Sequence, residues 1–257
     1  RIGRVVTAAP NSAYEWTAQR GVPRDPADVD LSNVVMIIGS EPVSISAIDT
    51  FRAAFAPFGL SPSAFKPSYG LAEATLFVAT IDPGAEVSVV HLDRGRLSEG
   101  RAEPVAAGDP AALPVVSCGH VARSLSCVIV DPSSRTELAD GLVGEIWLQG
   151  DNVGRGYWGR SGETEHTFGG RLAATNEAGG HASGAALDRT WLRTGDLGFY
   201  LEGELYVVGR LADLVIVAGR SHYPHDIEAT AASASPLVRR GYIAAFTVPG
   251  EPLERLV

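Results

Sequence analysis

The first third of the chain alternates unbroken apolar runs with amphipathic stretches. Residues 34–38 are a continuous apolar run that ends in Gly39-Ser40-Glu41-Pro42, a pattern typical of a buried parallel strand followed by a loop. The next stretch predicts a helix with one apolar face, because its large apolar side chains recur at spacings of 3, 4 and 3: Ile48, Phe51, Phe55 and Phe58. Ser46 is the expected N-cap of this helix.

A second strand is expected at residues 64–66, and residues 71–80 are expected to form a second helix. The order strand, helix, strand, helix predicts a parallel sheet. In such a sheet the loops after the strands open on the same carboxyl edge, where ligands bind. We therefore expect residues 39–42 and 68–73 to face one cleft.

The pattern changes after Asp82-Pro83-Gly84 to short β-like runs separated by turn pairs. The expected strands are residues 87–92, 126–130, 145–149, 203–208 and 214–217. Residues 169–188, rich in Gly, Ala and Ser, predict an exposed loop, and a helix is expected from Pro224 to about residue 235.

These elements predict an α/β and β architecture in three parts. Residues 1–82 would be the end of a parallel α/β subdomain. Residues 83–209 would be a distorted β-barrel subdomain with an inserted segment near 83–114. Residues 210–257 would be a hinge and the start of a small α+β C-terminal domain, truncated at residue 257.

Composition argues against some classes of function. The 257 residues carry a net charge of −9, which argues against a nucleic-acid partner, because such proteins need a basic face. No run approaches the roughly 20 apolar residues of a transmembrane helix. The two cysteines, Cys118 and Cys127, are expected to be buried thiols in a reducing cytoplasm. Lys66 is the only lysine.

Four motifs occur in a particular order and spacing. They are Tyr69-Gly70-Leu71-Ala72-Glu73, then Gly144-Glu145-Ile146-Trp147 through Gly154-Arg155-Gly156-Tyr157-Trp158, then Arg193-Thr194-Gly195-Asp196-Leu197, and Gly209-Arg210-Leu211-Ala212-Asp213. Each motif alone is a weak signal. Together they resemble the adenylate-forming superfamily of acyl-CoA synthetases, luciferases and peptide-synthetase adenylation domains, and the resemblance covers nearly all of the chain.

Further segments narrow the resemblance to fatty acyl-AMP ligases: Gly39-Ser40-Glu41-Pro42, Val116-Ser117-Cys118-Gly119 and Gly219-Arg220-Ser221-His222-Tyr223-Pro224. Asn11-Ser12-Ala13-Tyr14-Glu15-Trp16 and the segment from Ser68 to Glu73 are similar to the actinobacterial long-chain type. In that type the ligase feeds the polyketide synthase of mycolic-acid assembly. The resemblance implies ATP and a fatty acid as substrates and an acyl carrier protein as partner.

The resemblance also implies site residues. Glu73 matches the family's metal-associated glutamate, and its carboxylate would suit Mg²⁺, which prefers oxygen ligands and bridges to phosphates. The alternative for Glu73 is a solvated glutamate at a helix start. Asp196 and Arg210 match the family's ribose-binding pair, and a carboxylate can accept from both hydroxyls of a ribose. Their alternatives are a turn-capping aspartate and a surface arginine.

The remaining expected contacts come from the two loops. Tyr69 would stack on adenine, and Gly70 would let the backbone approach the nucleotide. Ser68, Leu71 and Ala72 belong to the same nucleotide-binding segment. Gly39, Ser40 and Glu41 would border the adenine and acyl pockets, chiefly through their backbone.

The family's phosphate loop would precede residue 1, and its catalytic lysine would follow residue 257. We therefore expect a fragment lacking both ends, inactive by itself. Ala212 stands where the family carries a charged pivot residue. Two other functions remain open at this point, a long-chain acyl-CoA synthetase and a non-catalytic nucleotide-binding or interaction domain.

Overall fold

The computed structural model of the protein describes residues 3–183, 185, 189–217, 220–235, 237–238, 243–248 and 255–257. Parts of the loop at 169–188, Gly219 of the Gly219–Pro224 motif and much of the expected C-terminal domain lie outside the described residues. The helices are α1 Asn11–Arg20, α2 Ile45–Phe55, α3 Arg94–Ser98, α4 Ser161–Phe168 and α5 Pro224–Ala234. Short 3₁₀ turns are η1 Pro26–Asp28, η2 Ala56–Phe58 and η3 Ala72–Ala74.

Within the described residues, the strands form two main sheets and three smaller ones. The first, in spatial order, contains β1 Val5–Ala9, β2 Val34–Ile38, β3 Phe65–Tyr69, β4 Ala79–Thr80 and β7 His120–Val121. The second contains β11 Glu204–Arg210, β10 Leu192–Leu201, β9 Gly144–Gly150 and β8 Leu125–Val130. The two-stranded sheets pair β5 Val89–Asp93 with β6 Ala112–Val116, β12 Val215–Val217 with β13 Arg220–His222, and β14 Thr247–Val248 with β15 Arg255–Leu256.

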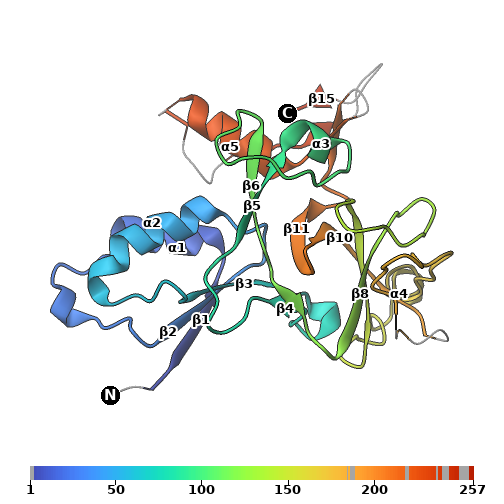
Figure 1. The fold of residues 1–257 in the computed structure, drawn as a ribbon, viewed down its shortest axis with the longest axis horizontal. Coiled ribbons are helices and arrows are strands. Elements are labelled where there is room, and N and C mark those ends of the chain that lie inside the picture. The colour runs from blue at the N-terminus through green and yellow to red at the C-terminus, as the bar shows by residue number, and fades with distance from the viewer. Residues whose placement is uncertain are drawn as a thin grey trace.

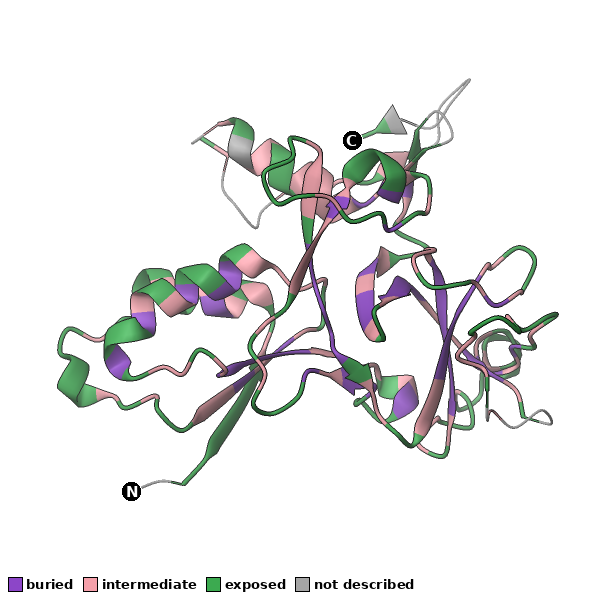
Figure 2. Ribbon diagram, viewed as in Figure 1, coloured by how far each residue is buried: buried purple, intermediate pink, exposed green. Residues whose placement is uncertain are grey.

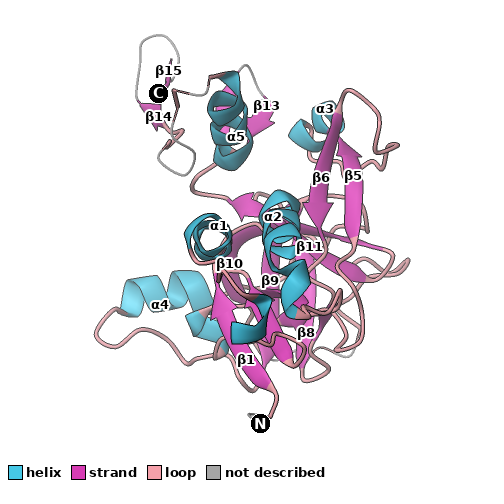
Figure 3. Cartoon of the chain, turned by 90° about the vertical axis from the view of Figure 1, so that its left-hand side faces the viewer, coloured by secondary structure: helices cyan, strands magenta, loops and turns pink. Residues whose placement is uncertain are grey.

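The α/β end of the molecule follows the apolar pattern. Strands β1, β2 and β3 are parallel, and α1 and α2 lie side by side against them (Figures 1 and 3). The apolar face of α2 fills the core between helix and sheet, where the rings of Phe51 and Phe55 stack with centroids 4.3 Å apart. The strand at 34–38 and the amphipathic helix are therefore confirmed.

The expected N-cap at Ser46 is wrong by two residues. The helix begins at Ile45, and the Ser44 hydroxyl accepts from the backbone N–H of Ala47 at 3.3 Å. Ser44 has extended backbone angles, whereas Ser46 is already helical. The position at which the chain leaves the extended region decides between two serines that are chemically equal candidates.

The expected helix at residues 71–80 is also wrong. Only η3 is helical, and Thr75 and Leu76 then adopt left-handed φ values of 52° and 75°. The backbone N–H of Val78 returns to the Tyr69 carbonyl at 3.0 Å, so β4 pairs antiparallel with β3. The chain after Tyr69 therefore makes a tight reversal, and Glu73 lies within it, half-buried.

The β-rich part is confirmed as a fully antiparallel sheet, β8 to β11. Within the described residues these four strands form an open sheet and do not close into a barrel. Buried residues concentrate along its strands, while the outer faces of α1 and α2 are exposed (Figure 2). Cys118 and Cys127 are both buried free thiols, as expected.

The segment expected as an insertion is a hairpin. Strands β5 and β6 pair antiparallel, and α3 occupies the connection between them. Leu92 and Leu97 are buried against Phe199 and Val208 of the antiparallel sheet and against Tyr223, which precedes α5. A cavity of about 510 Å³ separates α3 from α5. The hairpin thus contacts both the antiparallel sheet and the C-terminal segment.

The described part of the loop at 169–188 is tethered. Glu137, which is 7% exposed, accepts hydrogen bonds from the backbone N–H groups of Asn176, His181 and Ala182 at 2.8, 2.6 and 2.9 Å. The His181 ring also stacks on Tyr200 with centroids 3.8 Å apart. One carboxylate therefore holds this segment to the antiparallel sheet.

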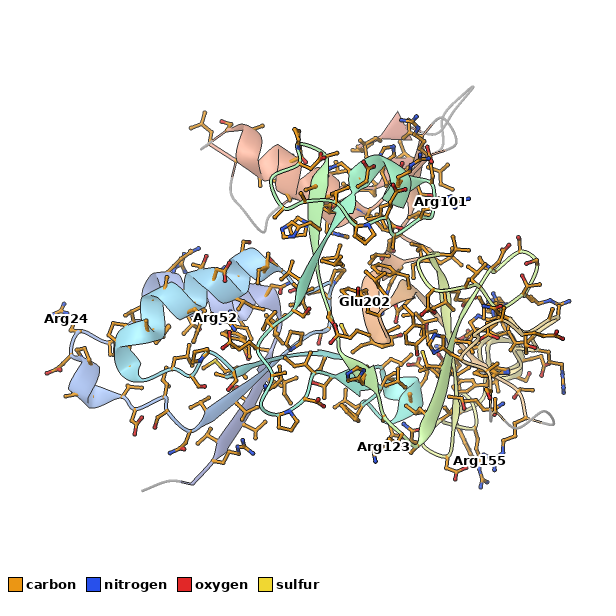
Figure 4. The ribbon with its side chains drawn as sticks, viewed as in Figure 1. Arg24, Arg52, Arg101, Arg123, Arg155 and Glu202 are labelled. Carbon is orange, nitrogen blue, oxygen red and sulfur yellow. The ribbon has the colours of Figure 1, made fainter. Side chains whose placement is uncertain are left out.

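Arg24, Arg123 and Arg155 are exposed; Arg24 lies at the end of the ribbon that carries the helices α1 and α2, and Arg123 and Arg155 lie on the opposite side (Figure 4). In the part of the chain that the structure describes, no helix has the length and apolar character needed to cross a membrane.

Candidate active site

Three residues from distant parts of the sequence meet at one point. Tyr69 ends β3, Asp196 lies in β10, and Arg210 ends β11 opposite Asp196 in the strand register. The Tyr69 hydroxyl donates to Asp196 Oδ2 at 2.7 Å, and Arg210 Nε lies 3.3 Å from Asp196 Oδ1. The structure therefore brings together the residues expected at the base and the ribose of a nucleotide.

Burial sets the electrostatics of this group. Asp196 is 8% exposed, and burial raises the pKa of its carboxyl, while the Tyr69 hydrogen bond and Arg210 act in the opposite direction. Burial and the nearby Asp196 carboxylate hold the pKa of Tyr69 well above its usual range. The Arg210 side chain, by contrast, is 71% exposed. The Asp196 carboxylate is therefore a buried hydrogen-bond acceptor, and the Arg210 guanidinium lies beside it at the protein surface.

Glu73 lies beside this group, close enough for its charge to raise the pKa of Asp196. Its Oε1 accepts a 2.6 Å hydrogen bond from the Tyr157 hydroxyl. Within the described residues no hydrogen bond reaches its Oε2. Glu73 borders a cavity of about 180 Å³ whose other walls are Leu71, Glu145, Tyr157, His166, Thr167, Arg193, Thr194 and Gly195.

The residues around Glu73 suit a Mg²⁺ ion that is bound jointly by the protein and a nucleotide. The described residues contain no cluster of three or more His, Cys, Asp or Glu that could hold a metal alone. Mg²⁺ bound with nucleotides takes one or two carboxylates and completes its octahedron with phosphate oxygens and water. A half-buried carboxylate that lines a cavity and has one oxygen engaged by a phenol fits that role.

The two expected loops do meet. A Cβ on Gly39 would lie 2.5 Å from the Ser68 carbonyl oxygen, so only glycine permits this approach of the loop after β2 to the end of β3. Glu41 Oε1, however, accepts from the backbone N–H of Asn11 at 2.8 Å. Ser68 is likewise occupied, with its hydroxyl 2.7 Å from that of Thr80. Glu41 and Ser68 thus bond to protein groups.

Gly70 has an internal role. A Cβ there would lie 1.6 Å from the Leu76 carbonyl oxygen, so the reversal after Tyr69 requires glycine whatever the ligand. Leu71 lines the cavity beside Glu73, and Ala72 is exposed. Ser40, exposed, has a left-handed φ of 69°.

Sequence reasoning missed two contributors. Glu145, only 2% exposed, accepts from Trp147 Nε1 at 2.8 Å and from the Gly195 N–H at 3.2 Å, and its carboxylate lies 3.3 Å from Arg193 Nη2. It therefore fixes the turn that precedes Asp196. Tyr157 holds Glu73, as described above. Both residues stand within the motifs, but their partners lie 50 and 84 positions away, so spacing gives no signal.

Comparison with known proteins supplies the family. Residues 4–158 match the family model of the AMP-binding enzymes. The chain is 48% identical to the long-chain-fatty-acid–AMP ligase FadD32 of Mycolicibacterium smegmatis, over 98% of this chain and 40% of that protein. It is 44% identical to the long-chain-fatty-acid–AMP ligase FadD28 of Mycobacterium tuberculosis, over 98% of this chain and 41% of that protein.

Solved structures agree with these relatives. One from a study of fatty acyl-adenylate ligases of E. coli and L. pneumophila superposes with a TM-score of 0.81 at 31% identity, covering 98% of this chain and 42% of that one. The L. pneumophila ligase in complex with acyl adenylate and pyrophosphate gives a TM-score of 0.71 at 35% identity, with the same coverage. The chain spans about 40% of the length of the relatives it matches.

Proposed function

Because this chain belongs to the AMP-binding enzyme family, we propose that the complete protein activates a long-chain fatty acid with ATP, forming acyl-AMP and pyrophosphate. The observation that carries this proposal is the convergence of Tyr69, Asp196 and Arg210 at one point. The similarity to long-chain-fatty-acid–AMP ligases over nearly the whole chain supports the choice of substrate. We expect the enzyme to act in the cytoplasm, in lipid biosynthesis of the mycolic-acid kind.

Each site residue receives a role under this proposal. Asp196 accepts from the ribose hydroxyls through the oxygens that face Tyr69 and Arg210. Arg210, exposed at the end of β11, completes the ribose contact. The ring of Tyr69 borders the adenine. Glu73 offers its free oxygen to Mg²⁺.

The reaction is a displacement at phosphorus. An oxygen of the fatty carboxylate attacks the α-phosphorus of ATP, the P–O bond to the β-phosphate breaks, and pyrophosphate leaves with the bonding electron pair. Catalysis of such transfers depends on positioning and on stabilising the charge that develops. When bound, Mg²⁺ would supply positive charge to the phosphate oxygens. This chain's residues would hold the nucleoside in place, and Tyr157 holds the Glu73 carboxylate that would bind Mg²⁺.

We propose further that the acyl group passes to an acyl carrier protein of a polyketide synthase and not to free coenzyme A. The hairpin of β5, α3 and β6 supports this, because Leu97 and Tyr223 pack in one apolar cluster and so couple the hairpin to the C-terminal segment. Contacts that favour the adenylating arrangement by about 3 kcal/mol would leave under roughly 1% of molecules in a rotated, thioester-forming state. A carrier protein that binds the rotated state would restore it.

The test uses the complete protein with labelled fatty acid, ATP and Mg²⁺. Free coenzyme A and a phosphopantetheinylated carrier protein are supplied in parallel reactions. We expect acyl-AMP and pyrophosphate in both, and acyl transfer only to the carrier. Rapid formation of acyl-CoA without carrier acylation would instead identify an acyl-CoA synthetase. Absence of acyl-AMP in both reactions would refute adenylation itself.

A further inference from the structure

The segment after β9 is fastened to the turn that carries Glu73. The backbone N–H of Gly154 donates to the Glu73 carbonyl at 2.7 Å. The Thr75 hydroxyl donates to the Asn152 carbonyl at 2.6 Å, and Asn152 Nδ2 donates to the Ala74 carbonyl at 2.7 Å. These three bonds hold the two backbones together without any help from the Tyr157 hydroxyl.

The Tyr157 side chain is itself well fixed. Its ring meets Phe168 edge to face, with centroids 5.3 Å apart and planes at 73°. Its backbone N–H donates to the Thr164 hydroxyl at 2.8 Å. The phenol hydroxyl therefore stands at a defined position at the wall of the 180 Å³ cavity, and there it donates to Glu73 Oε1 at 2.6 Å.

We propose that Tyr157 is a positioning residue for Glu73: its phenol occupies Oε1 and fixes the carboxylate so that Oε2 faces the cavity. A glutamate side chain has three rotatable bonds, and holding it in one arrangement costs free energy. A ligand to Mg²⁺ must meet near-octahedral geometry. The hydrogen bond from Tyr157 fixes the conformation of the Glu73 side chain before the metal and the nucleotide bind.

This inference rests on the proposed role of Glu73 and predicts a specific defect. In Tyr157→Phe the ring keeps its contact with Phe168, and the three backbone-segment bonds remain. Nucleotide binding without Mg²⁺ should therefore be unchanged. The additional tightening that Mg²⁺ gives should fall by about tenfold, the size of one lost hydrogen bond to a charged group.

The experiment measures, by calorimetry on the complete protein, the affinity for a non-hydrolysable ATP analogue without Mg²⁺ and with saturating Mg²⁺. Tyr14→Phe is the matched control, because it also removes one phenol hydrogen bond, to the Ile37 carbonyl at 2.9 Å, far along the sequence from Glu73. We expect this control to keep the wild-type response to Mg²⁺. Thermal unfolding confirms that each variant is folded.

A double-mutant cycle separates positioning from support of the fold. In a Glu73→Gln background no carboxylate is left for Tyr157 to position, so Tyr157→Phe should cause no further change in the response to Mg²⁺. Additive effects would overturn the inference, as would an equal loss of affinity with and without Mg²⁺. A wild-type protein that binds the analogue with Mg²⁺ yet makes no acyl-AMP would refute the proposed function and leave this inference standing.

Discussion

The phenol of Tyr69 donates a 2.7 Å hydrogen bond to Asp196, across 127 positions of sequence. This bond joins the end of the parallel sheet to the middle of the antiparallel sheet. The buried carboxylate that receives it is costly to ionise but well placed to accept further hydrogen bonds. Ribose binding would therefore favour the ionised carboxylate of Asp196, whereas stability of the fold favours the protonated form.

Asp196→Asn should expose this conflict. A raised pKa in the folded state means that Asp196 favours folding when protonated and that this contribution is lost as pH rises through the raised pKa. Near neutral pH, Asn should leave Tm equal to or a few degrees above that of the wild type, and the difference should vanish near pH 4. Unfolding curves from pH 4 to 8 measure this, and a lower Tm at every pH would contradict it.

The same position should be indispensable for the nucleotide. Asp196→Ala removes the acceptor for at least one charge-assisted hydrogen bond, which corresponds to roughly tenfold or more in affinity for ATP or acyl-AMP. Calorimetry on the complete protein provides the measurement. Unchanged affinity would show that the ribose binds elsewhere.

Glu73→Gln keeps the size of the side chain and its ability to accept from Tyr157, but it removes the negative charge. Because Mg²⁺ binds neutral amides more weakly than carboxylates in such sites, adenylation should slow sharply and require more Mg²⁺. Pyrophosphate release is followed over a range of Mg²⁺ concentrations. If the rate and the Mg²⁺ dependence match the wild type, Glu73 is only a surface glutamate of a 3₁₀ turn.

Gly70→Ala should disrupt the turn that carries Glu73. The new Cβ would lie 1.6 Å from the Leu76 carbonyl oxygen, a backbone atom that cannot move without opening the reversal. We expect a loss of several degrees in Tm together with the loss of Mg²⁺-dependent binding. Gly84→Ala is the control, since nothing lies within 4 Å of its Cβ position and its stability should be unchanged.

Glu137→Ala should release the loop that precedes β10. Three backbone N–H groups would lose their shared acceptor, and each bond to a charged group is typically worth about 1.5–3 kcal/mol. Trypsin should then cleave faster at the exposed Arg171 and Arg189. Glu137→Gln retains one side-chain oxygen and should give an intermediate cleavage rate, whereas equal rates in all three proteins would refute the tether.

The sequence predicts a helix or strand of this fold correctly where its apolar residues follow one clear pattern. The apolar run at 34–38 and the aromatic face of α2 are such cases. The reversal at Thr75 and Leu76 was missed, because left-handed angles at residues other than glycine depend on contacts elsewhere in the chain. Residues 71–80 read locally as helix, and the pairing of β4 with β3 overrides that preference.

The candidate site was predictable to the extent that motifs mark it. The resemblance supplies the positions of Tyr69, Glu73, Asp196 and Arg210, and the structure brings these four residues together, while their roles stay predictions. The side chains that hold them were not identified. The contacts of Tyr157 with Glu73 and of Glu145 with Gly195 join residues far apart in sequence. No local periodicity encodes such pairs.

The only lysine of the chain is buried and hydrogen-bonded to the backbone. Lys66 is 6% exposed, and its Nζ donates to the carbonyls of Asp82 at 3.0 Å and Ala85 at 2.8 Å, just before the β5–β6 hairpin. Its lone pair becomes available only if a proton leaves and those two bonds break. Acylating reagents that attack lysine amines therefore find one buried ammonium group in this chain, because the other twenty basic side chains are arginines.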